Sequence, residues 1–268
     1  MAFAPAALVE PPVRAPLPYG LFSVLLWRPD GEGRWRNGAS WESGTCDPAR
    51  GIGDVACDPD VDTIGLPKDL SWDQLAGAAS PFTVYGVWAC SPVAATPERA
   101  EEMARAHLLA REEARVEQAL WLGDLGNVPN LTAAVTAAGA GATVTGATVE
   151  EAWGELEGLL GEEYGSLGVI HAPRKHALVA LAKGILETSG GRLRTKLGTP
   201  VAAGAGYPDE GRIIGAGALF GYRTDVFVPS ARSGDLLDHT RNDLYAVAER
   251  TYLIGFDPCG VGAATIPA

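Results

Sequence analysis

The chain has 268 residues, of which 47% are hydrophobic and 20% are charged, and its formal net charge is −12. This composition is typical of a globular protein with a sizeable core and excludes a disordered or collagen-like chain. The acidic balance argues against a protein that coats nucleic acid with its whole surface. No apolar run reaches the roughly 18 residues that would predict a membrane-spanning helix.

Residues 1–20 are predicted to form an extended arm. They are rich in proline, which favours extended backbone and cannot continue a helix. The segment also lacks a basic start, so it is not a signal peptide and we expect a cytosolic protein. Because the arm is apolar, it needs a partner surface in its own subunit or in a neighbouring one.

Residues 21–75 are predicted to be largely extended. They begin with a strand-like run over 21–27 and continue through turn signals into a long stretch with little periodicity. Trp27, Trp35 and Trp41 lie in this region, which is poor in local core residues. These side chains therefore either fold back onto the domain or pack on another subunit.

The four cysteines are Cys46, Cys57, Cys90 and Cys259, and their spacing matches no zinc signature. Cys46 and Cys57 each begin a Cys-Asp-Pro triplet in the long extended stretch. A disulfide or a metal clip between them is one interpretation. We favour the other, in which both are unpaired loop residues.

One long charged helix dominates the middle of the chain. A strand over 81–90, rich in β-branched and aromatic residues, precedes it. Thr96 is a suitable N-cap, Pro97 takes the first helical position and Gly123 is a stop signal, so we predict a helix from Pro97 to Leu122 or the residue before it. Its apolar stripe is narrow, which places one face on a body and the other toward water or charged neighbours.

The remainder of the chain alternates short elements. Residues 131–148 are mostly alanine, glycine and threonine, which suits small strands or a mobile loop. Two helices are expected, over 148–160 and from Pro173 to Gly184. The other predicted elements are strands at 167–171, 199–202, 212–214, 217–222, 225–228, 244–248, 249–256 and 260–266. Together these elements predict an α+β fold class.

No catalytic or cofactor-binding motif is complete. The best phosphate-loop candidate ends at Gly146 and is followed by Ala147, where that loop needs lysine. We therefore expect no catalytic residue, no metal site and no cofactor. A small α/β enzyme, with His171 or Asp243 in a cleft, is the alternative from another functional class.

Histidines and aspartates also occur in groups, which we expect to be solvated rather than metal-binding. The groups are His171 with His176, then Asp54, Asp58, Asp60 and Asp62, and finally Asp235, Asp238 and Asp243.

Several segments carry a resemblance to a known family. Residues 110–123 are an acidic helix end that closes on an apolar pair and glycine. Residues 148–160 and 169–173 give a helix, a strand and a proline, 198–201 give a short strand, and 245–256 give a long strand. In this order they resemble the major capsid proteins of tailed phages, which have the Hong Kong phage-type fold that encapsulin shells also use. The resemblance covers nearly the whole chain.

The resemblance implies a tailed-phage major capsid fold with five parts. These are an N-arm at 1–20, an extended E loop at 21–75, a peripheral domain with the spine helix at 76–138, an axial domain at 139–215, and return strands of the peripheral domain at 216–268.

The same resemblance implies a structural virion protein rather than an enzyme. Its partners would be copies of itself, in hexamers and pentamers of an icosahedral shell, together with scaffold, portal and decoration proteins. The shell would enclose double-stranded DNA without sequence-specific binding, would assemble in the host bacterial cytoplasm, and would have no membrane partner. An acidic inner surface would keep the packaged DNA from adhering.

Elementary physics also favours assembly. The arm and the tryptophan-bearing stretch are too extended and too apolar to be stable alone, so we expect them to lie on neighbouring subunits. Charged faces of the long helix would then set the register between subunits. The candidates for contacts between subunits are Trp27, Arg34, Trp35, Arg36, Trp41, Glu101, Arg105, Arg111, Glu112 and Arg115. On this hypothesis, replacing Trp35 with alanine weakens assembly more than subunit stability.

An encapsulin-like shell is the alternative within the same class. Encapsulins of this fold begin with an amphipathic helix that docks cargo, and the proline-rich residues 1–20 cannot form such a helix, which favours the phage interpretation. Lys68 is the lysine nearest the extended stretch and has no assignable asparagine partner, so we expect no covalent cross-linking between subunits.

Overall fold

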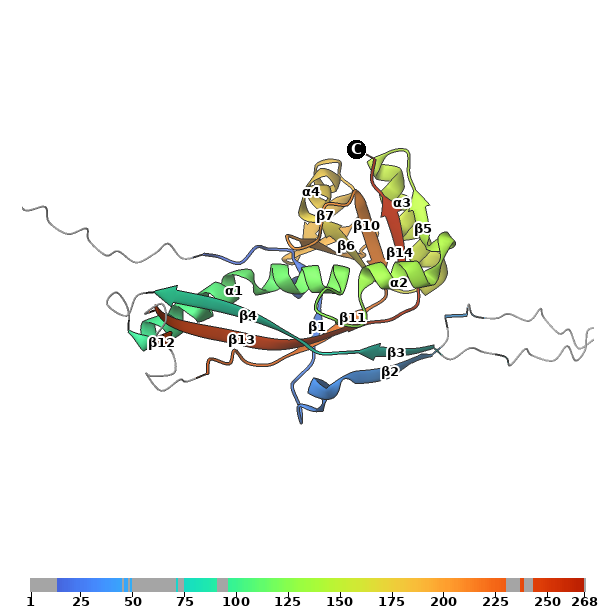
Figure 1. Ribbon diagram of the computed structural model, residues 1–268. Helices are drawn as coiled ribbons and strands as arrows, with labels where there is room; N and C mark the ends of the chain where they lie inside the picture. The colour runs from blue at the N-terminus through green and yellow to red at the C-terminus, as the bar shows by residue number, and fades with distance from the viewer. Residues whose placement is uncertain are drawn as a thin grey trace, which may run out of the picture.

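The computed structural model describes residues 14–44, 46, 47, 49, 71, 75–90, 96–229, 237–238 and 243–267. Several sequence expectations lie outside these residues: those on most of the arm, on Cys57, on Lys68, and on the aspartates at 54–62 and at 235. The described chain forms an α+β fold with two sheets and one projecting hairpin (Figure 1). No described helix combines the length and the apolar character that a bilayer-spanning helix needs.

The larger body contains an elongated five-stranded sheet, the large sheet, which is centred on one long strand, β13 (Asp243–Phe256). This strand pairs antiparallel with β4 (Phe82–Cys90) from Leu244 opposite Cys90 to Tyr252 opposite Phe82. Three further strands complete the sheet: β11 (Leu219–Arg223), β12 (Leu237–Asp238) and β1 (Leu26–Trp27), the last of which runs parallel to β11. Burial alternates along β4, so one face of the sheet is covered and the other is open.

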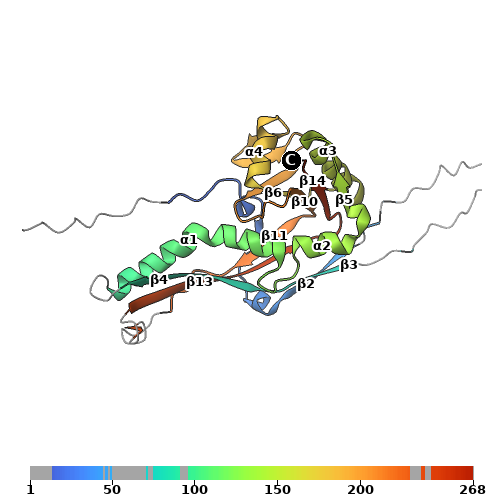
Figure 2. The ribbon, with the colours of Figure 1, turned by 45° about the horizontal axis from the view of Figure 1, so that its top comes forward.

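Helix α1 (Pro97–Leu122) covers that face and lies along the long strands (Figures 1 and 2). The Thr96 side chain accepts a hydrogen bond from the Arg99 backbone N–H at 3.3 Å and caps the first turn. Gly123 ends the helix with a φ of 70°, a left-handed conformation that glycine adopts without steric cost. The predicted helix and its two ends are confirmed.

The second body is a seven-stranded sheet in the order β5-β14-β10-β6-β9-β8-β7. Its strands are β5 (Thr143–Thr145), β6 (Val169–Pro173), β7 (Leu186–Ser189), β8 (Arg192–Thr195), β9 (Pro200–Gly204), β10 (Arg212–Ala216) and β14 (Gly262–Thr265). It packs with α3 (Val149–Leu159), the π-helical turn η4 (Leu160–Tyr164) and α4 (Arg174–Ala182) around a second core that includes Trp153 and Ile170.

The third part is the hairpin of β2 (Ala39–Gly44) and β3 (Leu75–Ala79), which projects from the body (Figure 1). At its base, Trp35 and Leu253 are buried together, and the Trp35 ring stacks on Tyr222 at 5.5 Å between centroids. Trp35 belongs to the short helix η2 (Arg34–Asn37), and its indole N–H donates to Asp30.

Three predictions of strands differ from the structure in detail. Residues 21–27 form the short 3-10 helix η1 (Leu21–Ser23) and then the two-residue β1, instead of one strand. Residues 225–228 make a single bridge, between Phe227 and Glu249, and no strand. The two strands expected at 244–248 and 249–256 from local composition are one continuous strand, as the long strand at 245–256 in the family resemblance implies. In each case, the extent of the strand depends on which distant segments pair with it, and the local sequence does not show those partners.

The region 131–148 also differs from expectation because it contains helix α2 (Leu131–Ala138), the 3-10 turn η3 (Ala140–Ala142) and β5. Asn130 caps α2 by accepting from the Ala133 N–H at 2.8 Å. Leu131 and Val135 are four residues apart and both buried, so a helix gives them one shared face.

The structure assigns two segments differently from the sequence-based division. β14, counted with the return strands at 216–268, lies in the seven-stranded sheet between β10 and β5. Residues 21–41, counted with the extended loop, contribute core: Leu21 is fully buried and Trp35 is 6% exposed. The projecting part therefore begins at the β2–β3 hairpin.

We predict that Trp35→Ala destabilises the isolated subunit by about 3–5 kcal/mol, because it removes a buried indole from the base of the hairpin. Urea unfolding of subunits measures this loss. Tyr85→Ala is the matched control, since the Tyr85 side chain is 66% exposed and its loss should cost well under 1 kcal/mol. Equal stability of Trp35→Ala and wild type would show that this tryptophan serves only contacts outside the subunit.

Candidate functional site: docking of the N-terminal segment on the long helix

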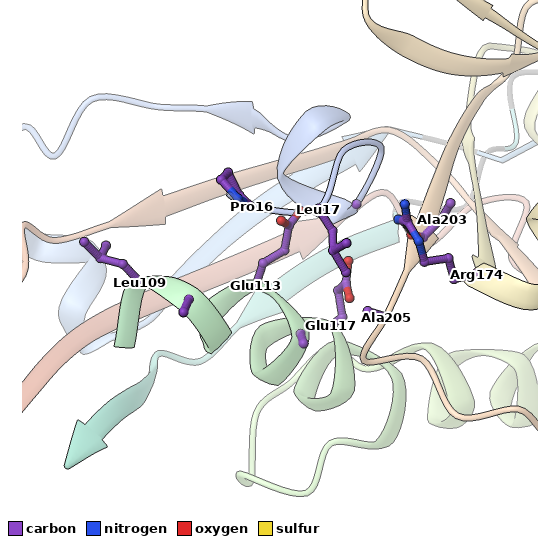
Figure 3. A pocket seen from close by; sticks show the side chains of 11 residues that line it. Pro16, Leu17, Leu109, Glu113, Glu117, Arg174, Ala203 and Ala205 are labelled. Atoms are coloured by element: carbon purple, nitrogen blue, oxygen red, sulfur yellow. Dashed lines mark hydrogen bonds between the residues drawn. The ribbon is translucent and has the colours of Figure 1, made fainter. Parts of the chain in front are cut away.

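The N-terminal segment docks where α1 meets the seven-stranded sheet (Figure 3). Glu117 of α1 accepts two backbone hydrogen bonds, from the Leu21 N–H at 2.9 Å and from the Gly206 N–H at 2.8 Å. Glu113, one turn earlier, accepts from the Phe22 N–H at 2.8 Å. The bonds from Leu21 and Phe22 satisfy N–H groups at the start of η1 that have no partner within that short helix.

The docked segment is held from the sheet side as well. The Ala203 N–H of β9 donates to the Tyr19 carbonyl at 2.7 Å, and Arg174 at the start of α4 donates to the Pro18 carbonyl at 2.9 Å. Tyr19 has a φ of 68°, which is uncommon for a residue other than glycine. The hydrogen bonds to the Pro18 and Tyr19 carbonyls hold the backbone in this conformation. Pro18 to Phe22 thus join α1 to the second body.

Close backbone approach makes this junction possible. A Cβ added at Gly206 would lie 1.7 Å from the carbonyl oxygen of Ala114 in α1. Glycine at 206 therefore lets the chain after β9 touch the helix backbone and present its N–H to Glu117.

Burial shifts the protonation equilibria of this junction. Desolvation raises the pKa of Glu117 from 4.5 to about 7, against the opposing effect of its backbone hydrogen bonds. Desolvation also raises the pKa of Glu113, and the neighbouring Arg174 partly offsets that rise. Tyr207 lies beside both carboxyl groups, and burial together with their charge keeps the pKa of its hydroxyl well above the ordinary value.

His171 is buried behind Tyr207 and lines no cleft. Its Nδ1 is 2.7 Å from the Tyr207 hydroxyl oxygen, and complete burial lowers its pKa to about 3, so the ring is neutral. His176 lies elsewhere, with Nε2 at 2.7 Å from Asp209. Among the described side chains, no group of three or more His, Cys, Asp or Glu could hold a metal ion.

A second carboxylate cluster joins α1 to the large sheet. Glu112 receives two hydrogen bonds from one guanidinium nitrogen of Arg250, at 2.9 and 3.0 Å, and a third from the Tyr252 hydroxyl at 2.6 Å. The Glu112 and Arg250 side chains are only 8% and 14% exposed. Removing either charge would leave its partner buried and uncompensated.

The three tryptophans among the candidate contact residues all pack on their own subunit. Trp35 is buried in the hairpin base. Trp27 makes an edge contact with Phe22 and lies under the Arg223 guanidinium at 4.5 Å. Trp41 meets Phe220 edge-on at 4.9 Å and is partly exposed.

The charged candidates divide into exposed and internal groups. Arg34 and Arg36 are exposed and pair with the nearby acids Glu32 and Asp30. Arg115 bridges to Asp124 at 3.0 Å, and Glu112 is internal, as described above. Three further candidates lie on α1: Glu101 is partly exposed, and Arg105 and Arg111 are exposed. Among the described ion pairs, none joins Glu101 to Arg105.

Sequence reasoning missed Glu113, Glu117, Arg174 and Tyr207 as the residues that fix the N-terminal segment. Glu113 and Glu117 stand among many charges on α1, so their type and spacing resemble those of solvent-facing acids. The available signal was Gly206 beside Tyr207 after a predicted strand, a place where backbone approaches another element.

The fold is similar to that of several solved structures. A protein of Microbacterium phage Oxtober96 is 12% identical, with a TM-score of 0.59 over 100% of this chain and 96% of that chain. The SrpI encapsulin of Synechococcus elongatus is 12% identical, with a TM-score of 0.57 over 98% and 92% of the two chains. The capsid of an empty GTA particle is 14% identical, with a TM-score of 0.55 over 100% and 96%.

No protein-family model and no curated protein matches the sequence. The structural likeness shows that the chain has the Hong Kong phage-type major capsid fold implied by the sequence resemblance.

We predict that Glu112→Gln destabilises the subunit by about 3–5 kcal/mol, because it leaves the buried Arg250 charge unpaired. The matched control is Glu102→Gln on the same helix. The Glu102 side chain is 68% exposed and pairs with Arg99 at the surface, so its loss should cost less than about 1 kcal/mol. Equal losses in the two variants, measured by urea unfolding, would contradict an internal role for Glu112.

We predict that Glu117 makes the subunit less stable as pH rises from about 4.5 to about 7. Over this window the folded protein keeps a proton that the unfolded chain has lost, so deprotonation favours unfolding, by roughly 2–4 kcal/mol in total. Buried His171 acts in the opposite direction between about 3 and 6.5, because only the unfolded chain binds its proton there.

The two effects are separated by subtracting the pH profile of Glu117→Gln from that of wild type. His171, Arg174 and Tyr207 are common to both proteins, whereas glutamine does not titrate. The difference should fall with rising pH across the window. The raised pKa of Glu113 is also common to both proteins, so its own titration cancels. A flat difference would show that Glu117 is ionised normally in the folded subunit.

Proposed function

We propose that this chain is a structural subunit that assembles with copies of itself into a closed icosahedral shell. The observation that supports this most is the match of fold along nearly the entire chain to an encapsulin and to the capsid of a GTA particle. The shape agrees with that role, since an elongated sheet and helix form one body, a compact sheet forms a second, and a hairpin projects from the first (Figures 1 and 2).

In this proposal the large sheet with α1 is the peripheral domain, the seven-stranded sheet is the axial domain, and the β2–β3 hairpin starts the extended loop. Contacts between subunits would use the exposed candidates on these parts: Arg34 and Arg36 at the hairpin base, and Arg105 and Arg111 on the outer face of α1. Exposed charges of this kind contribute specificity and register more than affinity.

We further propose a tailed-phage capsid, located in the virion and assembled in the bacterial cytoplasm, which encloses double-stranded DNA without reading its sequence. The net charge of −12 supports a container that does not adhere to nucleic acid. Scaffold, portal and decoration proteins are the further partners of such a capsid.

An encapsulin-like shell is the second candidate, and the match to the SrpI encapsulin favours it. The described start of the arm argues for the phage candidate, because residues 14–17 have no helical structure and Pro16 and Pro18 lie just before the docked segment. An enzyme that co-purifies inside the shell would identify an encapsulin, whereas DNA-filled particles in infected cells would identify a phage capsid.

We predict that deleting residues 2–17 leaves a folded subunit that does not form shells. The deleted part that the structure describes is exposed, whereas the contacts of Pro18, Leu21 and Phe22 with α1 and α4 remain. Sedimentation velocity should show fast, uniform particles for wild type and slow subunits for the deletion, with unchanged subunit unfolding. Shells of normal size from the deleted chain would contradict a role of the arm in assembly.

A further inference from the structure

The hairpin is bonded covalently to a distant part of the chain. Cys46, just after β2, forms a disulfide with Cys259, which lies 213 residues further along in the turn between β13 and β14. Cys46 was expected to be unpaired or paired with Cys57, so that expectation is wrong for Cys46. The bond attaches the far end of β2 to the point where the chain crosses from the large sheet to the seven-stranded sheet.

The Cys259 side of this bond is rigid. Cys259 is 5% exposed, and its N–H donates to the Asp257 carboxylate at 3.1 Å. Asp257 is itself held by its N–H to the Ala218 carbonyl at 3.1 Å. The next residue, Gly260, packs closely against Tyr164 at the end of η4, where a Cβ would lie 2.4 Å from the Tyr164 Cβ.

On the hairpin side, an aromatic contact supports β2 in addition to the disulfide. Trp41 packs on Phe220 and over Gly255, next to the buried Trp35. An open cleft of about 320 Å³ lies beside this contact, between residues 39–42 of β2 and residues of β11, and Arg28 and Asp257 also line it. The distal part of β2, from Glu42 to Gly44, thus lies between the aromatic contact of Trp41 and the disulfide of Cys46.

We propose that Cys46 and Cys259 form a reversible thiol–disulfide exchange site that takes low-molecular-weight disulfides such as oxidised glutathione, and that its redox state decides whether the distal part of β2 is docked. Reducing compartments keep such thiols reduced, and oxidising ones let the bond form. The site is a property of the single subunit and goes beyond the proposed function.

The exchange balances in two steps. The Cys46 thiolate, which is the partly exposed one, attacks oxidised glutathione and forms a mixed disulfide while one glutathione thiolate leaves. The Cys259 thiolate then attacks the Cys46 sulfur, forms the internal bond and expels the second glutathione. The two protons lost by the cysteines are taken up by the two glutathione thiolates, so two cysteines are oxidised and one glutathione disulfide is reduced.

Tryptic mapping of the intact protein tests the pairing, because each cysteine falls in a different peptide: 37–50, 51–68, 69–99 and 251–268. After incubation with oxidised glutathione, 37–50 should be linked to 251–268, and dithiothreitol should separate them. A dominant link between 37–50 and 51–68, or a stable glutathione adduct on 37–50 without the internal bond, would overturn the proposal.

Hydrogen exchange tests the consequence for the hairpin. Oxidation should increase amide protection in β2 and leave β4 and β13 unchanged, and reduction should reverse this and lower the midpoint of thermal unfolding by roughly 5–10 °C. Cys46→Ser in oxidising buffer should behave like reduced wild type. Cys90→Ser is the matched control and should behave like oxidised wild type, because Cys90 is free. Equal protection of β2 in oxidised and reduced wild type would overturn the proposal without bearing on shell assembly.

Discussion

The architecture depends on carboxylates of α1 that are buried or partly buried and face two different neighbours. Glu112 holds the large sheet through Arg250 and Tyr252, and Glu113 and Glu117 hold the N-terminal segment and the loop after β9. A buried carboxylate is costly to desolvate unless it is satisfied, so each of these groups requires its particular partners in place. One helix thereby specifies how the two bodies and the start of the chain are arranged.

This arrangement separates a rigid subunit from the parts that reach out of it. The aromatic cluster around Trp35 and the Cys46–Cys259 bond fix the hairpin base and the end of β2. The N-terminal segment is fixed from Pro18 onward, whereas Arg14 to Leu17 are exposed. A subunit built in this way carries its own core and has a projecting hairpin and an exposed N-terminal segment, as the proposed shell subunit requires.

Local signals made much of the fold predictable. The Thr96 cap, Pro97 and Gly123 define α1 within the sequence itself, and the β-branched and aromatic residues at 81–90 predict the strand β4. The errors occur where distant residues decide. Glu112 and Arg250 are 138 positions apart and Cys46 and Cys259 are 213 apart, so no local pattern distinguishes these residues from surface charges or loop thiols. For the same reason, the sequence does not distinguish packing of Trp35 on its own domain from packing on another subunit.

The central claim is that the subunit assembles into closed shells, and electron microscopy of the purified protein tests it most directly. The account predicts uniform icosahedral particles whose averaged density resolves subunits in rings of five and six, with α1 and the long strands in each wall. A discrete monomer or dimer that forms no shells or capsomers at high protein concentration would contradict it.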